Sequence, residues 1–67
     1  MKTFGDLVDL YIKKRRFSLR DIEAISGLTF GAVSYIRNNK RQPTLDSAIK
    51  LIKALEIPLE EVLEIYA

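Results

Sequence analysis

Two helix starts lie close together in this chain, on either side of Gly27. Ser18 can accept a hydrogen bond from the amide of Asp21, while the Asp21 carboxylate reaches back to the amide of Ser18. Thr29 offers a second cap soon after the glycine, which tolerates the left-handed conformation that ends a helix. This spacing predicts two short helices joined by a tight turn, the second over about residues 30–38.

Helical periodicity extends this pattern to the rest of the chain. Apolar residues at i, i+3, i+4 and i+7 predict a first helix over about residues 3–14. Asn39 can end the third helix in the left-handed conformation, and Pro43 forbids its continuation. Thr44 then caps a fourth helix, and a break at Pro58 precedes a fifth. The sequence predicts an all-α fold, a compact five-helix domain that occupies residues 1–67 as one unit.

The chain has no cysteine and no histidine. It therefore lacks thiolate and imidazole metal ligands, a thiol nucleophile and the commonest general base. We expect no catalysis, no metal and no cofactor, and a fold held by packing alone. No apolar run approaches the roughly 18 residues of a membrane span, and no leader pattern opens the chain. We expect a soluble protein without membrane contact.

Basic residues are concentrated in the first part of the chain. Residues 1–43 contain nine lysines and arginines and four acidic residues, for a net charge of +5. Residues 44–67 contain two lysines and five acidic residues, for a net charge of −3. A polyanionic partner would therefore meet the first part of the chain.

The residues around the tight turn resemble those of a known family. Segment 18–29, with its turn glycine and the cap Thr29, is similar to helix-turn-helix domains of the phage repressor and Cro type. The resemblance continues through the inward positions Val33 and Ile36 and the basic, proline and threonine residues of segment 39–46, and so covers nearly the whole chain. It implies a Cro-like or small repressor that binds a palindromic double-stranded DNA operator as a homodimer. The cytoplasm of a bacterial, archaeal or phage-infected cell is the expected location.

In this family the third helix is the recognition helix, so its outward residues are expected to contact bases. These residues are Phe30, Gly31, Ala32, Ser34, Tyr35 and Asn38. Base reading usually uses side chains that match donor and acceptor edges, such as arginine or glutamine, and this helix has few of them. We expect Phe30 and Ala32 to contact thymine methyl groups, although Phe30 can instead pack into the core.

Phosphate contacts position such a domain without reading sequence, and they need cations and amides at the two ends of the motif. Lys40 and Arg41 are the best candidates, and Arg20 and the cap Thr29 can serve at the other end. The basic run 13–16 fits a solvated helix end as well as it fits DNA contact.

Three positions depart from the pattern that the resemblance implies. Glu23 stands where the family most often has alanine, so its longer side chain must lean outward. Arg16 replaces a commoner glycine, which predicts backbone strain. Members often pair an arginine of the first helix with a glutamate of the recognition helix, but the matching residues here are Ile12 and Arg37. We therefore expect that ion pair to be absent.

The last helix carries more apolar surface than one flank of a core requires. Its expected dimer contacts are Leu59, Val62, Leu63 and Tyr66. The alternative is that this surface only closes the monomer. Because the chain ends at Ala67, we expect regulation without a ligand-sensing domain or a small-molecule ligand.

A second function stays open at this point. The recognition helix is aromatic and poor in hydrogen-bonding side chains, which would also suit an antitoxin or antirepressor that binds a polypeptide. DNA binding through several phosphates weakens steeply with salt, whereas binding to an apolar protein surface does not. A salt titration therefore separates the two functions.

Overall fold

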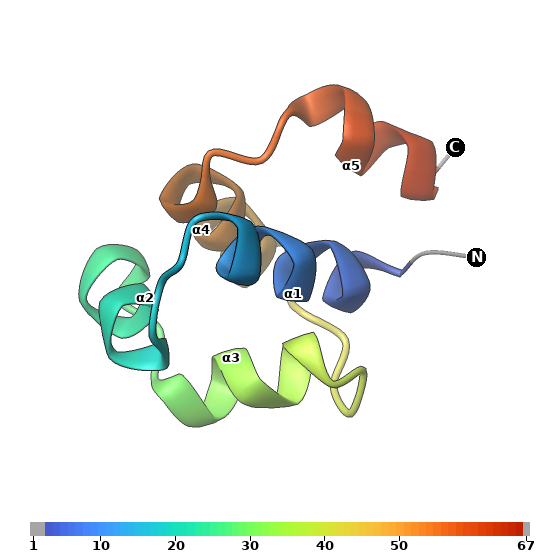
Figure 1. The fold of residues 1–67 in the computed structure, drawn as a ribbon. Helices are drawn as coiled ribbons and strands as arrows, with labels where there is room; N and C mark the ends of the chain where they lie inside the picture. The colour runs from blue at the N-terminus through green and yellow to red at the C-terminus, as the bar shows by residue number, and fades with distance from the viewer. Residues whose placement is uncertain (1–2, 67) are drawn as a thin grey trace.

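Five helices follow one another through residues 3–66, the part of the chain that the computed structural model describes (Figure 1). They are α1 (Phe4–Lys14), α2 (Leu19–Ser26), α3 (Phe30–Arg37), α4 (Leu45–Leu55) and α5 (Leu59–Tyr66). The predicted all-α, five-helix fold is confirmed, with α2 and α3 as the helix-turn-helix pair. None of the helices within residues 3–66 is long and apolar enough to cross a membrane.

Hydroxyl side chains fix the starts of the first four helices. Each hydroxyl accepts a hydrogen bond from an amide in the first turn, and the four caps are Thr3, Ser18, Thr29 and Thr44. Asp6 and Asp21 complete capping boxes on α1 and α2, because each carboxylate accepts the amide of its own cap residue. The predicted helix starts therefore arise from local hydrogen bonds.

Helix α1 lies at the centre of the packing. It contacts α3, α4 and α5, while α2 contacts α3 and α4 (Figure 1). The side chains that are almost completely buried are Leu7, Val8, Ile22, Val33, Leu51 and Leu55. Since these side chains come from α1 to α4, one core holds the α2–α3 pair against the rest of the domain.

Gly5 allows α1 and α3 to approach closely. It is buried in the first turn of α1, and its Cα faces the end of α3. A Cβ at this position would overlap the carbonyl oxygen of Ile36 and would lie 2.5 Å from Oδ1 of Asn39. No larger residue fits here unless the two helices move apart.

The inward face of α4 differs from the one that apolar spacing predicts. The sequence favours a stripe of Leu45, Ala48, Ile49, Ile52 and Leu55 with Leu51 beside it, but Leu45 and Ile49 are exposed. The buried face is centred between Leu51 and Leu55, with Ala48 and Ile52 half-buried at its edges. Apolar residues occupy more of the circumference of α4 than its neighbours cover, so periodicity alone cannot set its rotation.

Within residues 3–66, three non-glycine residues take the left-handed conformation. They are Arg16 (φ 58°), Asn39 (φ 60°) and Glu56 (φ 52°). Asn39 was predicted to end the third helix in this way, and Arg16 was predicted to be strained. Such a conformation costs about 1 kcal/mol or more for a residue with a side chain.

Candidate nucleic-acid interface

The turn between α2 and α3 is short and internally bonded. Gly27 ends α2 in the left-handed conformation with φ 78°, and its amide donates to the carbonyl of Glu23 at 2.9 Å. The buried Ser26 hydroxyl donates to the carbonyl of Ile22 at 2.6 Å and accepts the amide of Leu28 at 3.2 Å. These bonds hold the turn in one shape, so α3 has a defined orientation relative to α2.

Helix α3 turns one face into the core and the other to solvent. Val33 and Ile36 are buried, as predicted. Among the predicted base-contacting residues, Phe30, Tyr35 and Asn38 are exposed, while Gly31, Ala32 and Ser34 are half-buried. Helix α3 ends at Arg37, so Asn38 caps the helix and is not part of it.

Phe30 faces solvent, which decides between the two positions that the sequence leaves open. Its side chain is 57% exposed at the first position of α3. Val33 occupies the inward position one turn later, and Leu28 packs against the core from the turn. Phe30 is therefore not part of the core.

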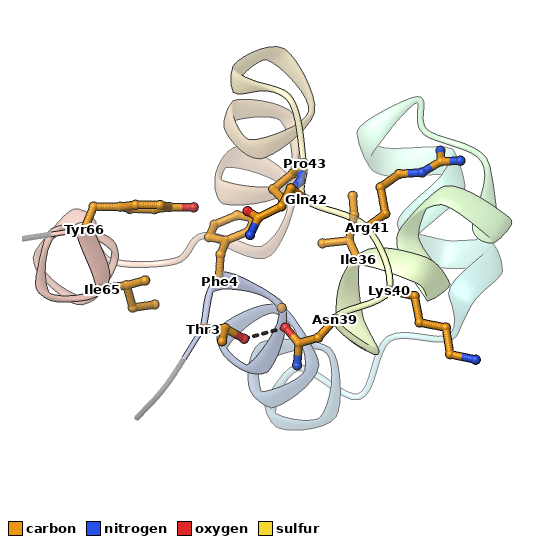
Figure 2. A pocket seen from close by; sticks show the side chains of 11 residues that line it. Thr3, Phe4, Ile36, Asn39, Lys40, Arg41, Gln42, Pro43, Ile65 and Tyr66 are labelled. Atoms are coloured by element: carbon orange, nitrogen blue, oxygen red, sulfur yellow. Dashed lines mark hydrogen bonds between the residues drawn. The ribbon is translucent and has the colours of Figure 1, made fainter.

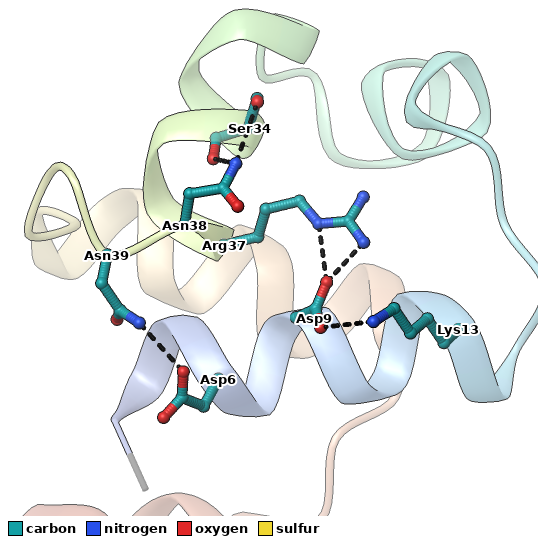
Figure 3. A network of polar contacts seen from close by, with 7 residues as sticks. All are labelled: Asp6, Asp9, Lys13, Ser34, Arg37, Asn38 and Asn39. Carbon is teal, nitrogen blue, oxygen red and sulfur yellow. Dashed lines mark hydrogen bonds and ion pairs between the residues drawn. The ribbon is translucent and has the colours of Figure 1, made fainter.

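Asn38 uses part of its hydrogen-bonding capacity on α3, the helix that it caps. Its side-chain nitrogen donates to the carbonyl of Ser34 at 2.8 Å (Figure 3). The same nitrogen lies 3.4 Å from the Ser34 hydroxyl. The face of α3 is therefore poorer in free donors than its sequence suggests.

Tyr35 and Arg41 form a single exposed unit. The Arg41 guanidinium lies over the Tyr35 ring, 5.4 Å from its centre. A backbone hydrogen bond holds the preceding residue as well, because the amide of Lys40 donates to the carbonyl of Tyr35 at 2.8 Å. One cation of the connection after α3 is thus placed beside an outward side chain of α3.

The predicted phosphate-contacting residues lie at both ends of the motif. Arg20, Lys40 and Arg41 are exposed. Thr29 is also exposed, but its hydroxyl already accepts the amide of Ala32 at 3.2 Å. Its role in the structure is to cap α3.

An open hollow of about 580 Å³ lies between the start of α1, the connection after α3 and the end of α5 (Figure 2). Phe4, Pro43 and Tyr66 line it, together with Asn39, to which the Thr3 hydroxyl donates. Lys40 and Arg41 also border the hollow, and the charged ends of their side chains point away from Phe4 and Tyr66 (Figure 2). Within residues 3–66 no group of three or more histidine, cysteine or acidic side chains is arranged to hold a metal ion.

The basic run after α1 makes contacts inside the domain. Nε of Arg15 donates to the carbonyl of Leu55 at 2.9 Å, and its Nη2 donates to that of Glu56 at 3.1 Å. These bonds satisfy carbonyls at the end of α4. Lys13 pairs with Asp9 at 3.0 Å. For Lys13 and Arg15, the structure therefore supplies a role that does not involve DNA.

Glu23 leans outward, as predicted, and reaches the next helix. Its Oε2 accepts the amide of Phe30, the first residue of α3, at 3.0 Å. A carboxylate is favoured there by the positive end of the helix dipole. Sequence reasoning missed this contact, because no local pattern indicates a bond between Glu23 and a residue seven positions later.

An ion pair that the sequence did not predict joins α1 to α3, although the pair expected to be absent, at Ile12 and Arg37, is indeed absent. Nε of Arg37 donates to Oδ1 of Asp9 at 2.9 Å, and Nη2 of Arg37 bonds the same oxygen (Figure 3). The charges are reversed relative to the pair that the resemblance implies, and the partner in α1 is Asp9 instead of Ile12. Ile12 is buried in the core. The negative charge that pairs with Arg37 therefore comes from Asp9, in the preceding turn of α1.

Hydrogen bonds to these carboxylates favour their charged forms. The Arg37 side chain, and secondly Lys13, lower the pKa of Asp9 below its ordinary value of 3.8. The Asn39 side chain donates to Asp6 at 2.9 Å and is the main reason that the pKa of Asp6 is also lowered. Both carboxylates thus help α1 to hold the end of α3 and the residues after it.

Three of the four predicted dimer residues are available on the surface. Leu59, Leu63 and Tyr66 are exposed on α5, whereas Val62 is only 8% exposed and packs into the core. Val62 is therefore removed from the predicted dimer surface. The Tyr11 hydroxyl donates to Glu61, which raises the pKa of Tyr11 and fixes α5 on α1.

Comparison with known proteins is consistent with this geometry. A family model described as helix-turn-helix matches residues 10–62, from within α1 to within α5. No curated protein and no solved structure matches the chain.

Proposed function

Because the chain belongs to the helix-turn-helix family of the phage repressor and Cro type, we propose that it is a sequence-specific transcriptional regulator that lays α3 in the major groove. The observation that carries this proposal is the exposed face of α3 on a helix anchored by Val33 and Ile36. The exposed side chains at the two ends of the motif can contact phosphates; they are Arg20, Lys40 and Arg41. Such a regulator acts in the cytoplasm, where it meets the DNA.

Its contacts with bases depend on apolar and aromatic side chains. Phe30 is exposed at the start of α3, where members of this family contact base edges. Tyr35 is half exposed and lies beside Arg41. Gly31, Ala32, Ser34 and Asn38 complete the proposed contact face. Methyl contacts and DNA shape therefore matter more than paired hydrogen bonds.

The proposed unit on DNA is a homodimer. Leu59, Leu63 and Tyr66 follow i, i+4, i+7 spacing and form one exposed apolar face on α5. A two-fold dimer would place two copies of α3 about 34 Å apart on palindromic half-sites. The exposed face of α5 is the surface that we assign to this contact.

A salt titration tests the proposal most directly. The logarithm of the binding constant for duplex DNA should fall linearly with the logarithm of salt concentration, with a slope of about −0.9 for each phosphate contacted. Lys40→Ala should make this slope shallower by about one unit and weaken binding to all sequences alike. Lys53→Ala removes the same charge from an exposed position of α4 and is the matched control.

A salt-independent interaction, or no binding to duplex DNA at low salt, would contradict DNA recognition. That result would favour the antitoxin or antirepressor function, in which the aromatic face around Phe30 and Tyr35 meets a polypeptide.

Tyr35→Ala and Phe30→Ala should change which sequence is preferred. Each variant loses contacts with base edges, so discrimination at one or two positions of each half-site should fall by about fivefold or more. Selection of binders from a random duplex library measures this for the wild type and both variants. The wild-type consensus should be a palindrome with half-sites about ten base pairs apart. If Lys40→Ala altered the preference and Tyr35→Ala did not, the assigned roles would be wrong.

A further inference from the structure

Glu23 places a negative charge at the start of α3. Its Oε2 accepts the Phe30 amide at 3.0 Å, although Glu23 itself belongs to α2. The side chain is exposed, and within residues 3–66 no lysine or arginine forms an ion pair with it. In the same part of the chain, its second carboxylate oxygen has no hydrogen-bond partner.

This carboxylate occupies a position that would otherwise suit a phosphate. The amides in the first turn of a helix attract anions, and DNA-binding proteins use them to hold the backbone. Here Glu23 takes the Phe30 amide and the Thr29 hydroxyl takes the Ala32 amide. The start of α3 therefore has little left to offer a phosphate, and its added charge repels one.

The same carboxylate is suited to a different part of DNA. The N-terminal residues of a recognition helix lie against base edges, so a group bonded to the first amide of α3 lies there as well. A carboxylate accepts hydrogen bonds and donates none. In the major groove its usual partner is the N4 amine of cytosine.

We propose that Glu23 is a specificity-determining residue that accepts a hydrogen bond from a cytosine N4 amine in each half-site. This inference rests on the proposed function. It identifies a base contact made from α2, outside the recognition helix, by a carboxylate that α3 itself holds in place. A cytosine at the matching position offsets the charge repulsion that every other sequence suffers.

Glu23→Gln is the decisive substitution. The amide oxygen of glutamine can still accept the Phe30 amide, so the midpoint of thermal unfolding should remain close to that of the wild type. Glutamine pairs with adenine through N6 and N7. In selections from a random duplex library, one position of each half-site should change from cytosine to adenine. Discrimination between these bases at that position should change by about tenfold or more.

Glu60→Gln serves as the control, because it removes an equal charge from an exposed position of α5. In Figure 1, α5 and α3 lie on opposite sides of α1. This variant should keep the wild-type consensus.

Two results would overturn the base contact. One is an unchanged consensus for Glu23→Gln on a wild-type protein that binds its palindrome normally. The other is tighter binding of Glu23→Gln to all sequences alike, which would leave Glu23 a cap that only repels phosphates. Both differ from failure of the proposed function, in which the wild type itself would show no salt-dependent binding to duplex DNA.

Discussion

Gly5→Ala is expected to remove most of the stability of the protein at 25 °C. The added methyl group would overlap the carbonyl oxygen of Ile36, and backbone cannot turn aside as a side chain can. Forcing α1 and α3 apart should cost about 3 kcal/mol, at the upper end for one inserted carbon atom. A domain of this size has only about 3–5 kcal/mol of stability in total. Urea unfolding followed by circular dichroism measures the loss.

Gly31→Ala provides the matched control for this prediction. Gly31 lies in α3, and a Cβ added there meets no atom within 4 Å. Alanine has the higher helix propensity, so this variant should gain about 0.5–1 kcal/mol and melt a few degrees higher. A Gly5→Ala protein as stable as the wild type would contradict the close crossing of α1 and α3.

Breaking the ion pair between α1 and α3 is expected to have the next largest effect on stability. The side chains of Arg37 and Asp9 are only 20% and 32% exposed, so either one left alone remains partly desolvated. Asp9→Ala and Arg37→Ala should each lower the free energy of unfolding by about 1–2 kcal/mol, between the values for exposed and buried pairs. In a double-mutant cycle, the two losses should fall well short of adding, because both report one interaction.

The pH dependence gives a second measurement of the same pair. The pKa of Asp9 is lowered in the folded protein, so its contribution is complete above the ordinary value of 3.8 and is lost as the pH falls through the lower folded-state pKa. The stability difference between wild type and Asp9→Ala should therefore shrink below about pH 4. Asp46→Ala removes an exposed partner of Lys50 in α4 and should cost less than 1 kcal/mol at neutral pH. A difference that persisted unchanged at low pH would contradict an ionic role for Asp9.

Local sequence signals predicted most of the fold. The capping residues Ser18, Thr29 and Thr44 mark helix starts because their partners lie within three residues along the chain. Gly27 marks the turn because few other residues accept its conformation. These signals located α3 to within about one residue, and they required no knowledge of how the helices pack.

The contacts that the sequence did not reveal depend on how helices are docked. Gly5 matters only because α1 crosses α3 at that point, and Asp9 meets Arg37 only after that crossing has formed. The rotation of α4 and of α5 about their own axes decides that Leu45 is exposed and Val62 is buried. Periodicity defines an apolar arc on a helix but leaves its centre uncertain when the arc is wide.

The reversed ion pair limits how recognition can be transplanted between relatives. The resemblance to the phage repressor and Cro type implies a glutamate where this chain has Arg37, so an α3 of that kind grafted onto this scaffold would bring a carboxylate up to Asp9. The chimera would then be destabilised by its own scaffold, whatever base contacts the new helix made. A graft that retained Arg37, or that changed Asp9 together with the helix, would avoid this repulsion. In this domain, the outward residues of α3 can be exchanged only together with the face of α3 that contacts α1.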